Sequence, residues 1–426
     1  MSPAFGRALR QLTTNDRSRL TGSNLFGQAL SFVGGLIIAR SLGPLGRGNV
    51  AIVTVYDEAS STALNLGIPA AVGHYAAQAP PCEEASVEGR LIGAALKIAA
   101  VTAPLAALIA YLVDRYAIEN APSAIRLLVV VAITATPFVN SVPVACRMLL
   151  VARQQIDRLI VVTLTPTLVR VAILTALALA GQMTSATAGI AVLASSWLSS
   201  VIAWRISGVR VERGGSVGPL LRYGIQTVPG GLAGLTNSRL DQLLMVPLLS
   251  SRELGIYAVA VGVAFVPVNV GAALSLTAYR EAARDDVLRT ASTKRLRQAV
   301  MLTFGAAAVS ALAAWFLLVP VYGDSFRDSV TPAVLLITGS AFIGTTSMLV
   351  QISNAAGRPA TGSWSSISAL VVTGVGLAIA LPRFGVVGAA VVSMLAYSTQ
   401  TIVTYILVRR HKHVGSLLTG RPPSIG

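Results

Sequence analysis

The chain has 426 residues, of which 54% are hydrophobic and 12% charged, and its mean hydropathy is +0.70. Soluble domains carry about 25% charged residues, so this composition excludes an ordinary water-soluble domain. The net charge of +16 would suit a nucleic-acid-binding protein only if the basic residues formed one solvated face, but here they lie between apolar runs.

Twelve stretches are long and apolar enough to cross a membrane as helices, because about 20 apolar residues span the hydrocarbon core. In chain order these stretches are Leu20–Ala39, Val50–Gly73, Leu91–Val113, Leu127–Ala145, Leu159–Ala180, Ala186–Trp204, Tyr223–Leu249, Gly255–Tyr279, Ala299–Val319, Ala333–Ser353, Ser363–Leu381 and Val386–Val408. A soluble helical solenoid would need a polar outer face on each helix, and these stretches lack one. The sequence therefore predicts an all-α integral membrane protein with about twelve transmembrane helices.

The basic residues indicate how the spans are oriented, since loops rich in arginine and lysine stay on the cytoplasmic side. With both termini in the cytoplasm, 24 of the 33 basic residues fall in segments on that side and seven in outer segments. Arg147 is counted in the cytoplasmic segment after the fourth span, whereas Arg170 and Arg239 lie inside spans. We therefore predict that both termini are cytoplasmic.

The chain also repeats itself. Residues around the first outer loop recur 207 positions later, Leu42, Gly48 and Ala51 as Leu249, Gly255 and Ala258. Shorter matches follow in the same order after the fourth and tenth spans and in the sixth and twelfth, and parallel repeats of this kind are a transporter architecture. We predict a six-helix lobe over residues 1–206, a cytoplasmic linker over 207–222, a second six-helix lobe over 223–408 and a basic cytoplasmic tail over 409–426.

Several short motifs carry a resemblance to a known family. Arg40–Gly48 follows the first span, Leu66–Pro69 lies in the second, and Leu254–Ala258 opens the eighth. Together with Asp241 in the seventh span and Asn354–Arg358 after the tenth, they resemble the polysaccharide flippase branch of the multidrug, oligosaccharidyl-lipid and polysaccharide exporter superfamily. The resemblance implies a V-shaped bundle of two pseudo-symmetric lobes in the bacterial cytoplasmic membrane.

The same resemblance implies an activity. Proteins of that branch carry an undecaprenyl-diphosphate-linked glycan from the cytoplasmic to the outer leaflet by alternating access, for cell-surface polysaccharide biosynthesis. The expected partners are the lipid-linked glycan, the membrane lipids, and the polysaccharide polymerase and glycosyltransferases of the same process.

Arg170 is the strongest candidate for an anion-binding residue. Ionisable side chains inside spans are costly, so they usually face a cavity or a partner. Arg170 lies in the middle of the fifth span, and Thr163 and Thr167 share its helical face. A guanidinium offers a planar fork of donors that matches phosphate oxygens, so we predict that Arg170 and Arg239 bind the lipid diphosphate and that Thr167 lines the substrate path. The alternative is that Arg170 pairs with Glu58, Asp241 or helix carbonyls only to be neutralised.

The seventh span carries a second polar face. Asp241 and Asn237 are one helical turn apart on that face, and Arg239 lies between them in sequence. We predict that these three residues line the substrate path. For Arg239 the alternatives are structural pairing and a place closer to the membrane surface.

The second span holds the remaining candidates. Glu58 and Asn65 share one helical face, and Asp57 lies beside Glu58. We predict that Asn65 contacts substrate, and that Glu58, Asp57 and Asp241 bind protons or sodium ions to couple transport. The alternative for each of the three carboxylates is structural pairing or exposure at the surface.

The sequence lacks motifs for catalysis or cofactor binding. It contains no G-x-x-x-x-G-K-[ST] phosphate loop, no H-E-x-x-H and only three histidines, and no loop is long enough for a nucleotide-binding domain. We predict no enzyme activity, no cofactor and no metal site, with energy supplied by an ion gradient, the membrane potential or downstream consumption of substrate. Two alternatives stay open: a cation-coupled multidrug exporter of the same superfamily, which favours an acidic lumen, and a membrane-embedded glycosyltransferase or polysaccharide polymerase, which needs a large outer loop.

Overall fold

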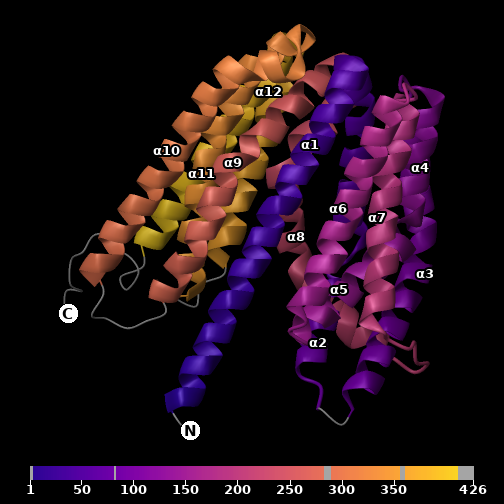
Figure 1. The fold of residues 1–426 in the computed structure, drawn as a ribbon, viewed down its shortest axis with the longest axis vertical. Coiled ribbons are helices and arrows are strands. Elements are labelled where there is room, and N and C mark those ends of the chain that lie inside the picture. The colour runs from indigo at the N-terminus through magenta and orange to yellow at the C-terminus, as the bar shows by residue number, and fades with distance from the viewer. Residues whose placement is uncertain (1–2, 81–82, 283–288, 356–359, 411–426) are drawn as a thin grey trace. The chain divides into compact units, whose positions relative to one another are not determined.

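The computed structural model describes residues 3–80, 83–282, 289–355 and 360–410, and over these residues the chain is helical, without β-strands. The elements in chain order are α1 (Pro3–Leu64), α2 (Ile68–Ala77), α3 (Glu84–Tyr116), α4 (Ser123–Thr136), the π-helix η1 (Pro137–Ser141), α5 (Val142–Ala152), α6 (Ile156–Leu179), α7 (Ser185–Ser207), α8 (Val217–Met245), α9 (Ser251–Ala282), α10 (Arg289–Tyr322), the 3-10 helix η3 (Asp324–Ser329), α11 (Val330–Ala355) and α12 (Ala360–Arg409). Figure 1 shows their course. The predicted all-α class is confirmed.

Each predicted span falls on a helix. Among the described residues, nine helices are long and apolar enough to cross a membrane. One of them, α1, holds the first predicted span and the first part of the second, and α12 holds the eleventh and twelfth. Each of these two helices is interrupted by one non-helical residue, Gly43 (φ 66°, ψ −173°) in α1 and Gly385 (φ 51°, ψ −135°) in α12. A side chain at such φ values is strained, which explains glycine at both positions. The fourth span is built from α4, η1 and α5 in succession.

The chain forms two compact units. Unit 1 comprises Met1–Leu42 and Asn49–Leu232, and unit 2 comprises Gly43–Gly48 and Ala233–Gly426. The boundary along the chain therefore falls inside α8, and the short segment Gly43–Gly48 packs with the second unit. The lobe limits predicted from the sequence, with a linker over 207–222, stay a prediction, and the predicted tail lies outside the described residues beyond Arg410.

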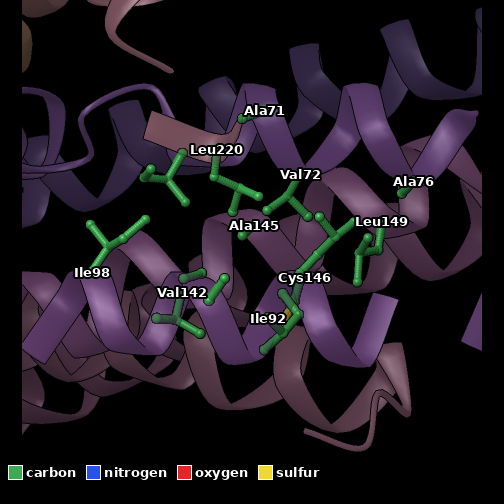
Figure 2. Packing of buried hydrophobic residues seen from close by; sticks show 14 of the residues in the cluster. Ala71, Val72, Ala76, Ile92, Ile98, Val142, Ala145, Cys146, Leu149 and Leu220 are labelled. Carbon is green, nitrogen blue, oxygen red and sulfur yellow. The ribbon is translucent and has the colours of Figure 1, made fainter. Parts of the chain in front are cut away.

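The core of unit 1 lies between α2, α3, α5 and the start of α8. Small and branched apolar side chains interlock there, and Figure 2 shows Val72, Ile92, Cys146, Leu149 and Leu220 among them. All five are nearly or fully buried. Since Leu220 of α8 belongs to this cluster, the first part of α8 is anchored in unit 1.

The segment before α8 is held against α3. The backbone N–H of Glu212 donates to the carbonyl of Gly89 (3.1 Å), and Lys97 Nζ donates to the carbonyl of Gly215 (3.3 Å). A Cβ on Gly89 would lie 2.4 Å from the carbonyl oxygen of Arg210, so only glycine permits this approach. The segment that precedes α8 is therefore part of the packed body of unit 1.

The second span is broken in its middle. The helix stops at Leu64 and restarts at Ile68, with Leu66 (φ 46°) and Gly67 (φ 68°) in the left-handed region. A Cβ on Gly67 would lie 2.3 Å from the carbonyl oxygen of Gly224 on α8, so the backbone of α8 lies close against the break. The sequence predicted one continuous span here, which is wrong because the left-handed turn interrupts it.

Unit 2 is a bundle in which α11 packs against α9, α10 and α12, and α10 packs against α9 (Figure 1). The buried side chains of α11 include Ile337, Ala341 and Met348. The short η3 joins α10 to α11 and buries Phe326. This arrangement places α11 at the centre of the unit.

The repeated residues found in the sequence pack against each other inside unit 2. A Cβ on Gly48 would lie 1.6 Å from the carbonyl oxygen of Ser251, and a Cβ on Gly255 would lie 1.9 Å from the carbonyl oxygen of Pro44. Pro44 and Ser251 are separated by 207 positions, as are Gly48 and Gly255. The two repeats therefore exchange equivalent contacts at this crossing, which glycine permits by bringing backbones together.

We expect Gly255→Ala to destabilise the protein by about 1–3 kcal/mol, because the new methyl group overlaps the Pro44 carbonyl and forces the backbones apart. The matched control is Gly262→Ala on the same helix, where a Cβ meets nothing within 4 Å. Thermal unfolding of the purified protein should show a lower midpoint for Gly255→Ala alone. Equal midpoints for the two variants would contradict the crossing.

Candidate functional site

Arg170 of α6 is half-buried and donates from Nη2 to Ser31 Oγ on α1 (2.9 Å). No carboxylate of the described residues forms a salt bridge with it, although Glu58 is close enough to act on it electrostatically. Thr163 and Thr167 are half-buried on the same helix and donate to the carbonyls of Leu159 and Thr163. A guanidinium in this setting keeps most of its donors for another partner.

The other candidates of the second span differ in exposure. Glu58 is exposed. Asn65 lies in the break before α2, is half-buried, and its side-chain oxygen is shielded from solvent without a hydrogen-bond donor. The structure thus places Asn65 at the left-handed turn, where the backbone leaves the helix.

Asp57 is buried, with 7% of its surface exposed, and its carboxylate accepts hydrogen bonds from neutral groups. Asn140 Nδ2 of η1 donates to Oδ1 (3.3 Å), and Ser196 Oγ of α7 donates to Oδ2 (3.3 Å). The hydroxyl groups of Ser60 and Thr136 form a further hydrogen bond in the same region, with 3.0 Å between the two oxygens. Among the described residues Asp57 has no basic partner, so unit 1 buries a carboxylate in a polar but uncharged cluster.

Asp241 forms a similar cluster in unit 2. Its Oδ2 accepts hydrogen bonds from the Tyr257 hydroxyl of α9 and from Ser393 Oγ of α12 (3.2 Å), and its Oδ1 accepts from the backbone N–H of Gln242 (2.8 Å). Asp241 and Tyr257 are 5% and 0% exposed. Each unit therefore buries a carboxylate that contacts a serine of another helix, Ser196 of α7 for Asp57 and Ser393 of α12 for Asp241.

Arg239 is half-buried and donates from Nη1 to Gln242 Oε1 (3.3 Å). Its charge also acts on Asp241, two residues further along α8. The side chain of Asn237 lies outside the described part of the chain. The structure thus brings Arg239 and Asp241 to one region of α8.

Four partners of the carboxylates were missed from the sequence: Asn140, Ser196, Tyr257 and Ser393. Each is a polar residue inside an apolar run, which is the signal that would have found Asn140 in particular. Serine is too frequent in membrane helices for that signal to select it, because its hydroxyl can bond its own helix.

Glu88 and Arg153 form a buried ion pair near the end of unit 1 where α5 ends. Arg153 Nε donates to Glu88 Oε1 (2.8 Å), Nη2 donates to Oε2, and Nη1 donates to the Ser207 carbonyl (2.7 Å). The side chain of Glu88 is 1% exposed. The hydrogen bonds with Glu88 raise the pKa of Arg153 above its ordinary value. This pair joins α3, α5 and α7 and is a structural feature.

Comparisons with known proteins agree with this architecture. A family model described as "Polysaccharide biosynthesis protein" matches residues 37–331. No curated protein matches the chain in sequence. At the identities of the solved structures, 12–14%, structural likeness establishes the fold alone.

Three solved structures illustrate that fold. The lipid II flippase MurJ in an inward closed conformation has a TM-score of 0.72 and 12% identity, over 94% of this chain and 90% of that one. An inward-facing multidrug resistance MATE family transporter of the MOP superfamily has a TM-score of 0.68 and 12% identity, over 93% and 96%. The MATE multidrug transporter DinF-BH in complex with R6G has a TM-score of 0.62 and 14% identity, over 94% and 96%.

We expect Glu88→Ala to lower the free energy of unfolding by about 3 kcal/mol, because it leaves the Arg153 guanidinium buried without its counter-ion. Replacing both residues, as in Glu88→Leu with Arg153→Met, should recover much of that loss. The control is Glu119→Ala, which removes an exposed pair with Arg115 (3.8 Å) and should change little. Thermal unfolding measures all three, and an unchanged midpoint for Glu88→Ala would refute the structural role.

Proposed function

Because the chain belongs to the family of polysaccharide biosynthesis proteins, we propose that it is a flippase for a polyprenyl-diphosphate-linked oligosaccharide. It carries this lipid from the cytoplasmic to the outer leaflet of the bacterial cytoplasmic membrane by alternating access and performs no catalysis. Its termini are cytoplasmic, and the polymerase and glycosyltransferases of cell-surface polysaccharide biosynthesis act before and after it. The transporter fold supports the proposal.

The proposed substrate class rests on one observation, the environment of the Arg170 guanidinium. A half-buried guanidinium held by one hydroxyl retains free donors for a diphosphate, and the planar fork matches two phosphate oxygens. In this proposal Thr167 and Asn65 lie along the same path in unit 1, and Arg239, Asp241 and Asn237 serve the corresponding role in unit 2. An arginine at this depth would be expensive without such a ligand.

We expect Arg170→Ala to reduce flipping of the lipid-linked oligosaccharide about tenfold, since a charge-assisted hydrogen bond contributes about 1.5–3 kcal/mol. Flipping is measured in cells that depend on the gene, as lipid-linked glycan retained on the cytoplasmic leaflet and polymer lost from the surface. Arg115→Ala, an exposed arginine paired with Glu119, is the control and should retain export. Normal export by Arg170→Ala at normal protein level would remove Arg170 from the site, and normal export in the deletion strain would refute the flippase.

The energy source in this proposal is an ion gradient that acts on Asp57 and Asp241, with Glu58 as a further candidate. A buried carboxylate surrounded by hydroxyl and amide groups changes charge when it binds a proton or sodium ion, and its neighbours can adjust to either state. The two clusters lie in different units, Asp57 in unit 1 and Asp241 in unit 2.

We expect Asp57→Asn and Asp241→Asn to fold but to lose stimulation by an imposed proton or sodium gradient, because the amide carries no exchangeable charge at the same size. Proteoliposomes with imposed gradients of each ion identify the ion. Asp324→Asn, at an exposed residue of η3, is the control. Full gradient dependence in both variants would exclude these carboxylates from coupling.

A cation-coupled multidrug exporter is the second candidate, favoured by the likeness to the MATE transporters. It requires a site for organic cations, for which the buried Asp57 and Asp241 are the candidate groups. Efflux of a cationic dye is compared between the deletion strain and the same strain with the gene restored. This comparison separates the multidrug exporter from the flippase. Dye efflux that depends on the gene, with unchanged glycan export, would favour the exporter.

A further inference from the structure

Arg147 of α5 is a half-buried arginine without a counter-ion. Its Nη2 donates to Ser199 Oγ of α7, and that hydroxyl donates to the Val162 carbonyl of α6 (3.2 Å). Its Nε is shielded from solvent and has no hydrogen-bond partner. Within the described residues it forms no salt bridge, and four of the five N–H donors of this guanidinium have no partner there.

The chain neutralises other arginines at comparable positions. Arg153, six residues further along, donates to both carboxylate oxygens of Glu88 and to a backbone carbonyl. Arg126 donates to both carboxylate oxygens of Asp114, each at 2.7 Å. Arg147 therefore stands apart, since an unpaired guanidinium inside a span lowers the stability of the fold and is expected where it serves a ligand.

Arg147 was not a candidate from the sequence because the fourth span was predicted to end at Ala145. The helix continues to Ala152, and the apolar helical segment Ser123–Ala152, which is long enough to cross a membrane, includes Arg147.

Arg170 belongs to α6, and Arg147 of α5 is connected to the same helix through Ser199. Ser199 links Arg147 to Val162, which precedes Arg170 by eight residues, or about 12 Å along the helix axis. Arg147 is on the side where α6 begins, which the distribution of basic residues assigns to the cytoplasm. Both guanidiniums are held by a serine hydroxyl and neither by a carboxylate.

We propose that Arg147 is a second anion-binding residue of unit 1 and binds the phosphate group of a lipid. Two lipids carry such a group into this part of the membrane: the diphosphate-linked substrate and an anionic phospholipid. If the ligand is the substrate, the inference rests on the proposed function and makes Arg147 the contact that precedes Arg170 on entry from the cytoplasm. Ser199 orients the guanidinium through Nη2, and the two N–H groups of Nη1 remain for phosphate oxygens.

The experiment measures lipid binding to the full-length protein in nanodiscs of neutral phosphatidylcholine. The probes are undecaprenyl diphosphate without sugar and phosphatidylglycerol, each titrated separately. Arg147→Gln and Arg147→Met should each weaken binding of one probe about tenfold. Arg158→Gln is the matched control, an exposed arginine at the start of α6 that donates to Gln155 Oε1 (3.1 Å), and it should change affinity less than twofold.

A second measurement separates binding from folding. Without added anionic lipid, Arg147→Met should unfold at the same temperature as the parent protein or higher, because it removes an unpaired charge. A lower midpoint in Arg147→Met together with unchanged affinity for both probes would overturn the proposal and assign Arg147 a structural role. Unchanged affinity for both probes in both variants overturns it as well.

The two sources of phosphate give different results. Loss of undecaprenyl diphosphate binding assigns the site to the substrate, and loss of phosphatidylglycerol binding alone assigns it to the bilayer; both support an anion site at Arg147. Arg170→Gln is measured in parallel. Weaker diphosphate binding in Arg170→Gln with no effect of Arg147 variants overturns this inference and leaves the proposed function standing.

Discussion

The cost of a charge in the hydrocarbon core determines how this chain uses its ionisable residues. A charge inside a span must be paired, bonded to polar groups or supplied with a ligand. Arg153 meets this condition with Glu88, whereas Asp57 and Asp241 accept hydrogen bonds from uncharged groups. Arg170 retains one hydroxyl partner, so most of its donors remain available. The way each charge is compensated therefore separates structural residues from candidates for binding.

Close backbone contact at glycine is the second organising feature. Gly48 and Gly255 sit at equivalent positions of the two repeats and meet in unit 2, while Gly67 meets Gly224 in unit 1. These contacts need residues without a side chain, because lipid offers little hydrophobic force to bring helices together. The same glycines that revealed the repeat in the sequence are thus those that the packing requires.

The helical class, the number of spans and their order could be predicted from hydropathy. A run of about twenty apolar residues inside a membrane satisfies its own backbone hydrogen bonds only as a helix or as part of a closed barrel. The break at Leu66 and Gly67 could not, since a left-handed turn inside an apolar run leaves hydropathy unchanged. Asp57 and Asp241 were recognisable as costly charges, but Ser196 and Ser393 were not, because their role depends on which helices pack together. Arg147 was missed because the predicted fourth span ended at Ala145, two residues before it.

Hydroxyl partners also fit the demands of transport better than carboxylate partners do. A flippase must release what it binds, so a guanidinium that is already neutralised by a carboxylate would have to break that pair before each binding event. A serine hydroxyl orients the guanidinium at little electrostatic cost and does not compete with phosphate. The same reasoning applies to Asp241, whose neighbours Tyr257 and Ser393 can donate or accept as the carboxylate changes charge. Under the proposed function, uncharged partners would therefore allow Arg170 and Asp241 to alternate between a bound and a free state.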